Sequence, residues 1–198
     1  MGILRIVNAG DDLFVDVPYG TWYYESVEDC AEMGLFNGTS PAKFSPDKPM
    51  TRAMLVTVLW RLDGEKAPAA PAEFADVAPG SWYANAVAWA SENGIVNGVG
   101  KGKFNPDGNV TREQMATILR RYAESKGLDV SGQADLTPYP DMDQVSDYAT
   151  EAMAWANAVG LINGNKVGGT IYLQPKGNAT RAQVAAILMR YVEKLMAN

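Results

Sequence analysis

The stretch FADVAPGSWYANAVAWASENGIVNG at residues 74–98, with FNPDGNVTR following at 104–112, decides the fold of this chain. The same landmarks stand at 14–52, each of them 60 positions earlier. They return between 139 and 181, where the offset from the second copy grows from 65 to 69 because the loops are longer. A repeated unit of this kind must stack on its neighbours to bury its apolar face. We therefore predict three units built to one plan.

The repeats set the predicted domain boundaries. Residues 64–73 are rich in proline and alanine, and residues 127–138 are rich in glycine and small polar residues, so both are read as linkers. The prediction is an N-terminal extension at 1–13, then repeats at 14–66, 67–126 and 127–198. A unit of this size is near the limit at which a hydrophobic core is stable alone. We expect the three repeats to form one composite domain.

Each repeat predicts two helices, so the expected fold class is all-α, made of helix-loop-helix units. The first helix should stop at a glycine, which adopts the left-handed conformation at low cost. The second should start at a threonine and carry an apolar stripe along one face. The expected starts are Trp22, Trp82 and Asp147 for the first helices and Thr51, Thr111 and Thr180 for the second, and the expected stops are Gly34, Gly94 and Gly160. The loops between the helices should contain turns, with room for a short extended pair, but no true sheet.

Composition narrows the classes of function. The net charge is −6 and no long basic run occurs, which argues against nucleic acid as a partner. One cysteine and no histidine exclude an internal disulfide, a histidine-based triad and a Cys/His zinc site. We predict no cofactor and no metal. Cys30 aligns with Ala90 and Ala156, so we interpret it as a packed helix residue.

The chain shows no sign of membrane insertion. No stretch approaches the roughly 20 apolar residues of a membrane span. Residues 1–10 lack the pattern of a signal peptide. Either the protein stays in the cytoplasm, or the chain is a fragment of a longer secreted protein.

The Thr-Arg pair that opens each second helix is the strongest functional signal. The threonine can cap the helix, and Gln114 and Gln183 stand three residues later, as a capping box requires. An arginine at the first helical position opposes the helix dipole, yet it recurs in all three copies. Two hypotheses stay open: an anion site made with the exposed backbone N–H groups, or an ion pair with the carboxylate of the same repeat. The residues concerned are Arg52, Arg112 and Arg181 for the arginines and Asp16, Asp76 and Asp141 for the carboxylates.

The pattern F-x-D-V, W-Y, G-[IL]-x-N-G, F-x-P and T-R, three times over, resembles the S-layer homology (SLH) family from residue 14 to residue 195. The resemblance implies a pseudo-threefold spindle of helices with a central bundle. It also implies grooves between adjacent repeats that bind an anionic secondary cell-wall polysaccharide, often one bearing pyruvylated N-acetylmannosamine. The groove arginine of the family maps to Arg52, Arg112 and Arg181.

The chain departs from the family pattern in a few places. Met54, Gln114 and Gln183 replace the glutamate of the Thr-Arg motif. Asp147 is read as standing where the other copies have Trp22 and Trp82. The arginines near the ends of the second helices, Arg61, Arg121 and Arg190, are attributed to the helix dipole alone.

These observations predict a non-catalytic module that anchors a protein to the cell wall by binding its polysaccharide. The expected location is the cell surface, where the chain could also take part in self-assembly through a parent surface protein. The candidate ligand-binding residues are Arg52, Arg112, Arg181, Asp16, Asp76, Asp141, Trp22, Trp82, Gly38, Gly98 and Gly164. A protein-interaction or assembly scaffold that no longer binds wall glycan is the alternative. A glycan-processing enzyme is a third reading, carried only by acidic pairs that nothing places across a cleft.

Overall fold

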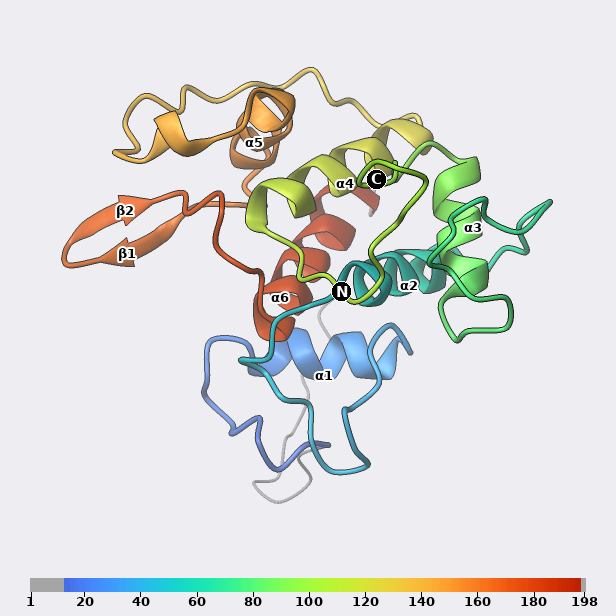
Figure 1. Cartoon of the computed structure of the whole chain (residues 1–198). Coiled ribbons are helices and arrows are strands. Elements are labelled where there is room, and N and C mark those ends of the chain that lie inside the picture. Colours follow the sequence, from blue (N-terminus) through green and yellow to red (C-terminus); the bar gives the residue numbers. More distant parts are fainter. Residues whose placement is uncertain (1–12, 197–198) are drawn as a thin grey trace.

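The computed structural model describes residues 13–196 of the chain. The predicted extension at 1–13 therefore lies outside the described residues except for Leu13. The helices are α1 (Tyr24–Glu32), α2 (Arg52–Leu62), α3 (Ala84–Glu92), α4 (Arg112–Ser125), α5 (Thr150–Ala158) and α6 (Arg181–Tyr191) (Figure 1). Two short 3-10 turns, η1 (Met142–Gln144) and η2 (Asp147–Ala149), precede α5, and a π-helical turn, η3 (Val192–Met196), follows α6.

The second helix of each repeat starts where its threonine predicts. Thr51, Thr111 and Thr180 are extended N-cap residues, and each hydroxyl accepts a hydrogen bond from the backbone N–H three residues on. The backbone N–H groups of Thr111 and Thr180 donate in turn to the side-chain oxygens of Gln114 and Gln183 at 3.2 Å, which confirms both capping boxes. Two donors at each of these helix ends are thereby satisfied.

The first helices begin slightly later than predicted, at Tyr24, Ala84 and Thr150. None of their N-cap residues makes a side-chain capping bond. The residues directly before each helix form turns. Each helix ends just before a glycine with φ between 67° and 73°, which is the left-handed stop that the sequence predicts.

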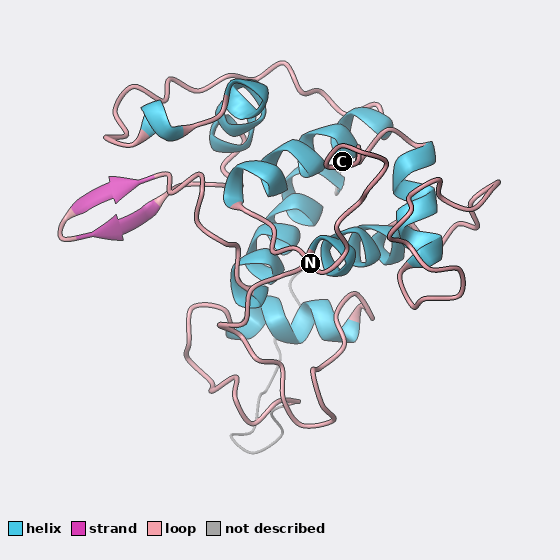
Figure 2. Cartoon of the chain, viewed as in Figure 1, coloured by secondary structure: helices cyan, strands magenta, loops and turns pink. Residues whose placement is uncertain are grey.

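The all-α prediction is wrong, because the third repeat contains a two-stranded antiparallel sheet. β1 (Asn165–Val167) pairs with β2 (Thr170–Tyr172), and the hairpin projects from the helices (Figure 2). Nine positions separate Gly164 from Leu173, against six between Gly38 and Phe44. The connecting residues Gly168 and Gly169 both have positive φ, as a two-residue hairpin turn requires. The shorter loops of the other repeats have room only for isolated bridges.

The helices pack between repeats in a closed order. α2 packs on α3, α4 on α5, and α6 on α1, so each second helix contacts the first helix of the following repeat and the last repeat contacts the first (Figure 1). The central helices contribute fully buried side chains such as Leu55, Leu59, Met115, Leu119 and Leu188 to one core. Each first helix therefore buries its apolar face against a repeat other than its own.

Backbone hydrogen bonds join the three repeats at the centre. Met50 N donates to Ala179 O, Ala179 N to Val110 O, and Val110 N to Met50 O, each at 2.9 Å. These residues stand directly before the three capping threonines. The ring fixes the starts of α2, α4 and α6 relative to one another, which brings their N-terminal arginines to equivalent places.

Candidate ligand-binding grooves

Three equivalent surface grooves lie beside the second helices, and each is lined by residues from all three repeats. One repeat contributes its second helix and Asn-Gly loop to a groove. The following repeat contributes an aromatic residue, and the preceding repeat contributes its Thr-Arg arginine. Groove 1 contains Arg61, Trp82 and Arg181; groove 2 contains Arg121, Tyr148 and Arg52; groove 3 contains Arg190, Trp22 and Arg112. Sequence reasoning expected each groove to form between two adjacent repeats, because it could not see the cyclic closure.

The Thr-Arg arginines are buried and reach into the loop of the following repeat. Arg181 donates from Nε to Phe44 O and from Nη2 to Asn37 O, both at 2.7 Å. Its guanidinium also lies 4.4 Å from the centre of the Phe44 ring. Arg52 repeats this arrangement with Phe104 O at 2.8 Å and Asn97 O at 3.1 Å. These arginines tie consecutive repeats together as well as lining a groove.

Arg112 is held by fewer bonds than its two counterparts. Its Nε donates to Leu173 O at 2.8 Å, and within the described residues no second bond from this guanidinium is recorded. Leu173 replaces the phenylalanine of the other repeats, so the ring contact is also missing. Burial lowers the pKa of Arg112, and the nearby carboxylate of Asp141 opposes that shift. Of the three Thr-Arg arginines, Arg112 in groove 3 therefore makes the fewest hydrogen bonds within the described residues.

Of the two hypotheses for the Thr-Arg arginines, the ion pair with the carboxylate of the same repeat is wrong. Asp16, Asp76 and Asp141 bind backbone instead, each accepting hydrogen bonds at 2.7 to 2.9 Å from two N–H groups of its own loop, which is Phe-x-Pro in the first two repeats and Leu-x-Pro in the third. The second residue of each pair, Ser45, Asn105 or Gln174, has a left-handed φ of 51° to 60°, and the carboxylate holds that uncommon conformation. Among the described residues, no ion pair within 4.0 Å joins these aspartates to the arginines; each aspartate acts through space on the pKa of the arginine of the preceding repeat, opposing the lowering caused by burial. None of the three lines a groove.

The helix N-termini are not open anion sites either. Arg52 N donates to Gly108 O at 2.9 Å and Ala53 N to Pro106 O at 3.0 Å, and the same pair of bonds recurs at α4 and α6. The third N–H is used by the capping threonine. An anion in a groove would therefore be held by arginine side chains rather than by the backbone N–H groups of the helix start.

The loops that line the grooves require glycine at their Asn-Gly positions for a steric reason. A Cβ at Gly38 would lie 2.4 Å from Ser40 O, and one at Gly98 would lie 2.5 Å from Lys103 O. At Gly164 it would lie 2.6 Å from a methyl group of Ile171. Glycine at these positions lets the loop fold tightly against the groove wall.

The aromatic of groove 2 is Tyr148, which corrects the sequence alignment. Counting back from the buried α5 residue Ala156, which is equivalent to Cys30, places Tyr148 opposite Trp22; Asp147 falls one position earlier and lines no groove. One additional residue between Asp141 and η2 caused the shift. Trp22, Trp82 and Tyr148 are 65%, 61% and 58% exposed, so each offers an open ring face.

Sequence reasoning missed the second arginine of each groove. Arg61, Arg121 and Arg190 were assigned to the helix dipole, yet each lines a groove. Arg61 also donates to Leu35 O at 3.0 Å and Arg190 to Leu161 O at 3.3 Å. Their recurrence in all three copies was the signal that could have found them.

Cys30 is confirmed as a packed helix residue. It is fully buried, and its Sγ lies 3.7 Å from Ala185 O on α6. Burial, reinforced by Asp29, raises the pKa of the thiol to about 12. Such a thiol stays protonated and is a poor nucleophile.

The closed ring of three helical repeats, with an arginine-rich groove beside each second helix, defines a class of repeat module. The S-layer homology domain family matches residues 13–53, 73–116 and 138–185. The chain belongs to this family. No helix of the described residues is both long and apolar enough to cross a membrane.

Similar proteins include surface-layer proteins and large enzymes. An amylopullulanase of Thermoanaerobacterium thermosulfurigenes is 34% identical over 93% of this chain and 10% of its own length. The surface-layer 125 kDa protein of Lysinibacillus sphaericus is 30% identical over 86% of the chain and 14% of its own length. The S-layer protein sap of Bacillus anthracis is 29% identical over 96% of the chain and 22% of its own length. The chain thus spans a tenth to about a fifth of these relatives.

Proposed function

We propose that this chain is a non-catalytic anchoring module that binds an anionic secondary cell-wall polysaccharide in its three grooves. One observation carries the proposal: within residues 13–196, each groove is lined by two arginines and an exposed aromatic ring but by no aspartate or glutamate, in a chain whose net charge is −6. Positive charge is concentrated in these places against the overall charge of the molecule. That distribution favours a ligand with negative charge.

The groove chemistry suits a sugar that carries a carboxylate, such as pyruvylated N-acetylmannosamine. Arginine pairs with a carboxylate through parallel N–H donors, and its guanidinium has more donors than the loop carbonyls use. Trp22, Trp82 and Tyr148 would stack on the sugar ring. The backbone N–H groups of the helix starts take no part, so the charge pairing would depend on the arginine side chains.

The relatives support anchoring as the role of this module in a longer protein. They include surface-layer proteins as well as an amylopullulanase, and the part that they share with this chain is a small fraction of each. A common attachment module explains that distribution. We propose that the parent protein is held at the cell surface by this chain.

Sedimentation with purified cell walls tests the proposal. The chain should sediment with walls that retain their pyruvyl groups and stay in solution when those groups have been removed. A variant with Arg61, Arg121 and Arg190 all replaced by alanine loses one arginine per groove and none of the bonds between repeats. It should remain folded by circular dichroism and lose wall binding; undiminished binding by this variant would refute the proposed role of the grooves.

A second candidate is an assembly scaffold that binds protein instead of glycan. The specific observation in its favour is the loss of all three motif glutamates, at Met54, Gln114 and Gln183. This candidate predicts equal sedimentation behaviour with walls that carry or lack pyruvyl groups. It also predicts self-association of the parent protein that soluble wall glycan does not reverse.

A further inference from the structure

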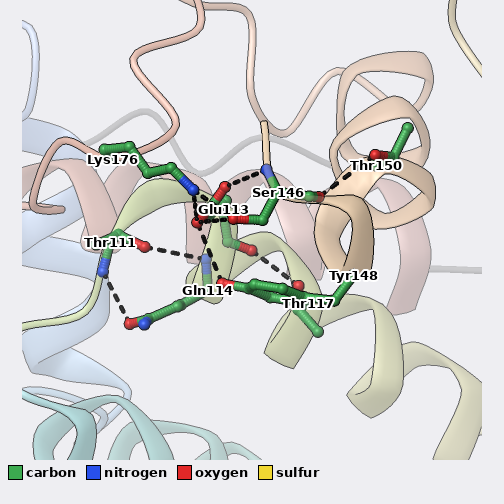
Figure 3. Close-up of polar contacts among 8 residues, drawn as sticks. All are labelled: Thr111, Glu113, Gln114, Thr117, Ser146, Tyr148, Thr150 and Lys176. Carbon is green, nitrogen blue, oxygen red and sulfur yellow. Dashed lines mark hydrogen bonds and ion pairs between the residues drawn. The ribbon is translucent and has the colours of Figure 1, made fainter. Parts of the chain in front are cut away.

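A buried carboxylate distinguishes groove 2 from the other two grooves. Glu113 is the second residue of α4 and is 3% exposed, whereas the equivalent residues of α2 and α6 are Ala53 and Ala182. Four donors converge on it (Figure 3). Lys176 Nζ lies 2.6 Å from Oε1, Ser146 donates from N and Oγ at 3.0 Å, and Tyr148 Oη lies 3.2 Å from Oε1. Lys176 also contacts Ser146 Oγ.

The charges in this cluster favour a bond from the tyrosine to the glutamate. Burial raises the pKa of Glu113, but the hydrogen bonds from Lys176 and Ser146 outweigh it and hold the pKa below its usual value. Burial and the Glu113 carboxylate raise the pKa of Tyr148 to about 12. At neutral pH the phenol is therefore protonated and donates to an ionised carboxylate, a charge-assisted bond stronger than a neutral one.

The groove aromatics of the other repeats have no such anchor. The recorded contacts of Trp22 and Trp82 are edge-on packing against Tyr23 and Tyr83, at 5.2 and 5.1 Å between ring centres. Within the described residues no hydrogen bond is recorded for either indole. Tyr148, by contrast, is fixed at its hydroxyl end, near enough to Arg52 for each to affect the pKa of the other.

We propose that Glu113 is a positioning residue of groove 2, holding Tyr148 beside Arg52 in the orientation that receives the ligand. The inference rests on the proposed function and adds that the grooves differ in preorganisation. Ordering a side chain before binding removes an entropic cost that the ligand would otherwise have to offset. Groove 2 would then compensate, through a fixed ring, for having a tyrosine where the other grooves have a larger tryptophan.

Methyl NMR can follow the three grooves separately in the intact chain. Val58, Ile118 and Ile187 occupy the same position on α2, α4 and α6, and each lines its own groove. Soluble, pyruvyl-bearing wall polysaccharide fragments are titrated into the labelled protein, and each methyl group reports the Kd of one groove. Fragments without pyruvyl groups provide the ligand control.

Three variants separate positioning from stability. Tyr148→Phe removes only the hydroxyl, keeping the ring and the Glu113–Lys176–Ser146 contacts. Glu113→Ala gives α4 the residue found in α2 and α6, and Glu113→Gln keeps an acceptor oxygen for the phenol. Glu124→Ala removes a carboxylate from the same helix that does not line groove 2 and is paired with Arg120, and it serves as the charge control.

The expected result is specific to one groove. Tyr148→Phe and Glu113→Ala should raise the Kd reported by Ile118 by roughly three- to tenfold, the loss expected when one side chain must be ordered on binding. The values from Val58 and Ile187 should not change, and Glu113→Gln should restore most of the affinity at Ile118. Without ligand, the pKa of Tyr148 should fall from about 12 toward its ordinary value in Glu113→Ala.

The outcomes also distinguish this inference from the proposed function. Shifts in all three methyl groups of the wild type, with an Ile118 Kd unchanged by Tyr148→Phe and Glu113→Ala, would overturn the positioning role and leave anchoring intact. An equal loss at all three methyl groups would overturn it too, because it would show a general effect on folding. No shift in the wild type at any groove would overturn the proposed function and this inference with it.

Discussion

Replacing Arg181 with alanine removes contacts that join the third repeat to the first. Arg181 donates to Phe44 O and Asn37 O and packs over the Phe44 ring. A hydrogen bond to a charged group contributes about 1.5–3 kcal/mol. Partial hydration of the freed carbonyls offsets some of this, so we expect the free energy of unfolding to fall by about 3 kcal/mol. Arg112→Ala should lose about half as much, since Arg112 makes one such bond and no ring contact.

Urea denaturation followed by tryptophan fluorescence would measure both losses, with thermal melting as a second readout. For a chain of this size, about 3 kcal/mol corresponds to a fall in Tm of roughly 6–12 °C. Arg121→Ala is the matched control, because Arg121 lines groove 2 and no hydrogen bond from it is recorded within the described residues. Its free energy of unfolding should change by no more than about 0.5 kcal/mol. If Arg181→Ala is as stable as Arg121→Ala, the inter-repeat bonds do not contribute as argued.

Three further predictions concern the helices and loops. The fragment 74–126 should be unfolded by circular dichroism, because α3 packs on α2 and α4 packs on α5, and neither partner is present; a sharp thermal transition of the isolated fragment would contradict this. Thr111→Ala should lower the free energy of unfolding by about 1 kcal/mol through the lost N-cap bond, and a melting curve like that of the wild type would show that the cap is dispensable. Gly98→Ala should cost about 1–3 kcal/mol because the new methyl group meets Lys103 O; Gly132→Ala, where a Cβ would lie at an ordinary 3.7 Å from Ala158 Cβ, is the steric control, and equal losses in the two would reject the clash.

Local signals made part of this structure predictable. A threonine cap, its glutamine three residues later and a glycine stop each act within about one helical turn, so the sequence places them without knowledge of the fold. The starts at Thr51, Thr111 and Thr180 and the stops at Gly34, Gly94 and Gly160 follow from such signals. Repetition of these signals also identified the family correctly.

The candidate site was predictable only in part. The recurrence of an arginine where the helix dipole disfavours it marked Arg52, Arg112 and Arg181, and all three line grooves. Recurrence was not enough for Arg61, Arg121 and Arg190, because a cation near a helix end already has a local explanation. Asp16, Asp76 and Asp141 became candidates because a charge opposite an arginine suggests a pair, whereas in the structure each carboxylate binds backbone N–H groups of its own loop.

By itself, the sequence determined that three like units follow one another, where their second helices start and their first helices stop, and which family they belong to. Only the tertiary structure decided which repeat each helix packs on, which arginine enters which groove, and that Glu113 meets Tyr148. The reason is that a regular repeat looks the same whether a residue contacts its own copy or the next one. Spacing along the chain cannot separate these choices; closure of the ring through Met50, Val110 and Ala179 does.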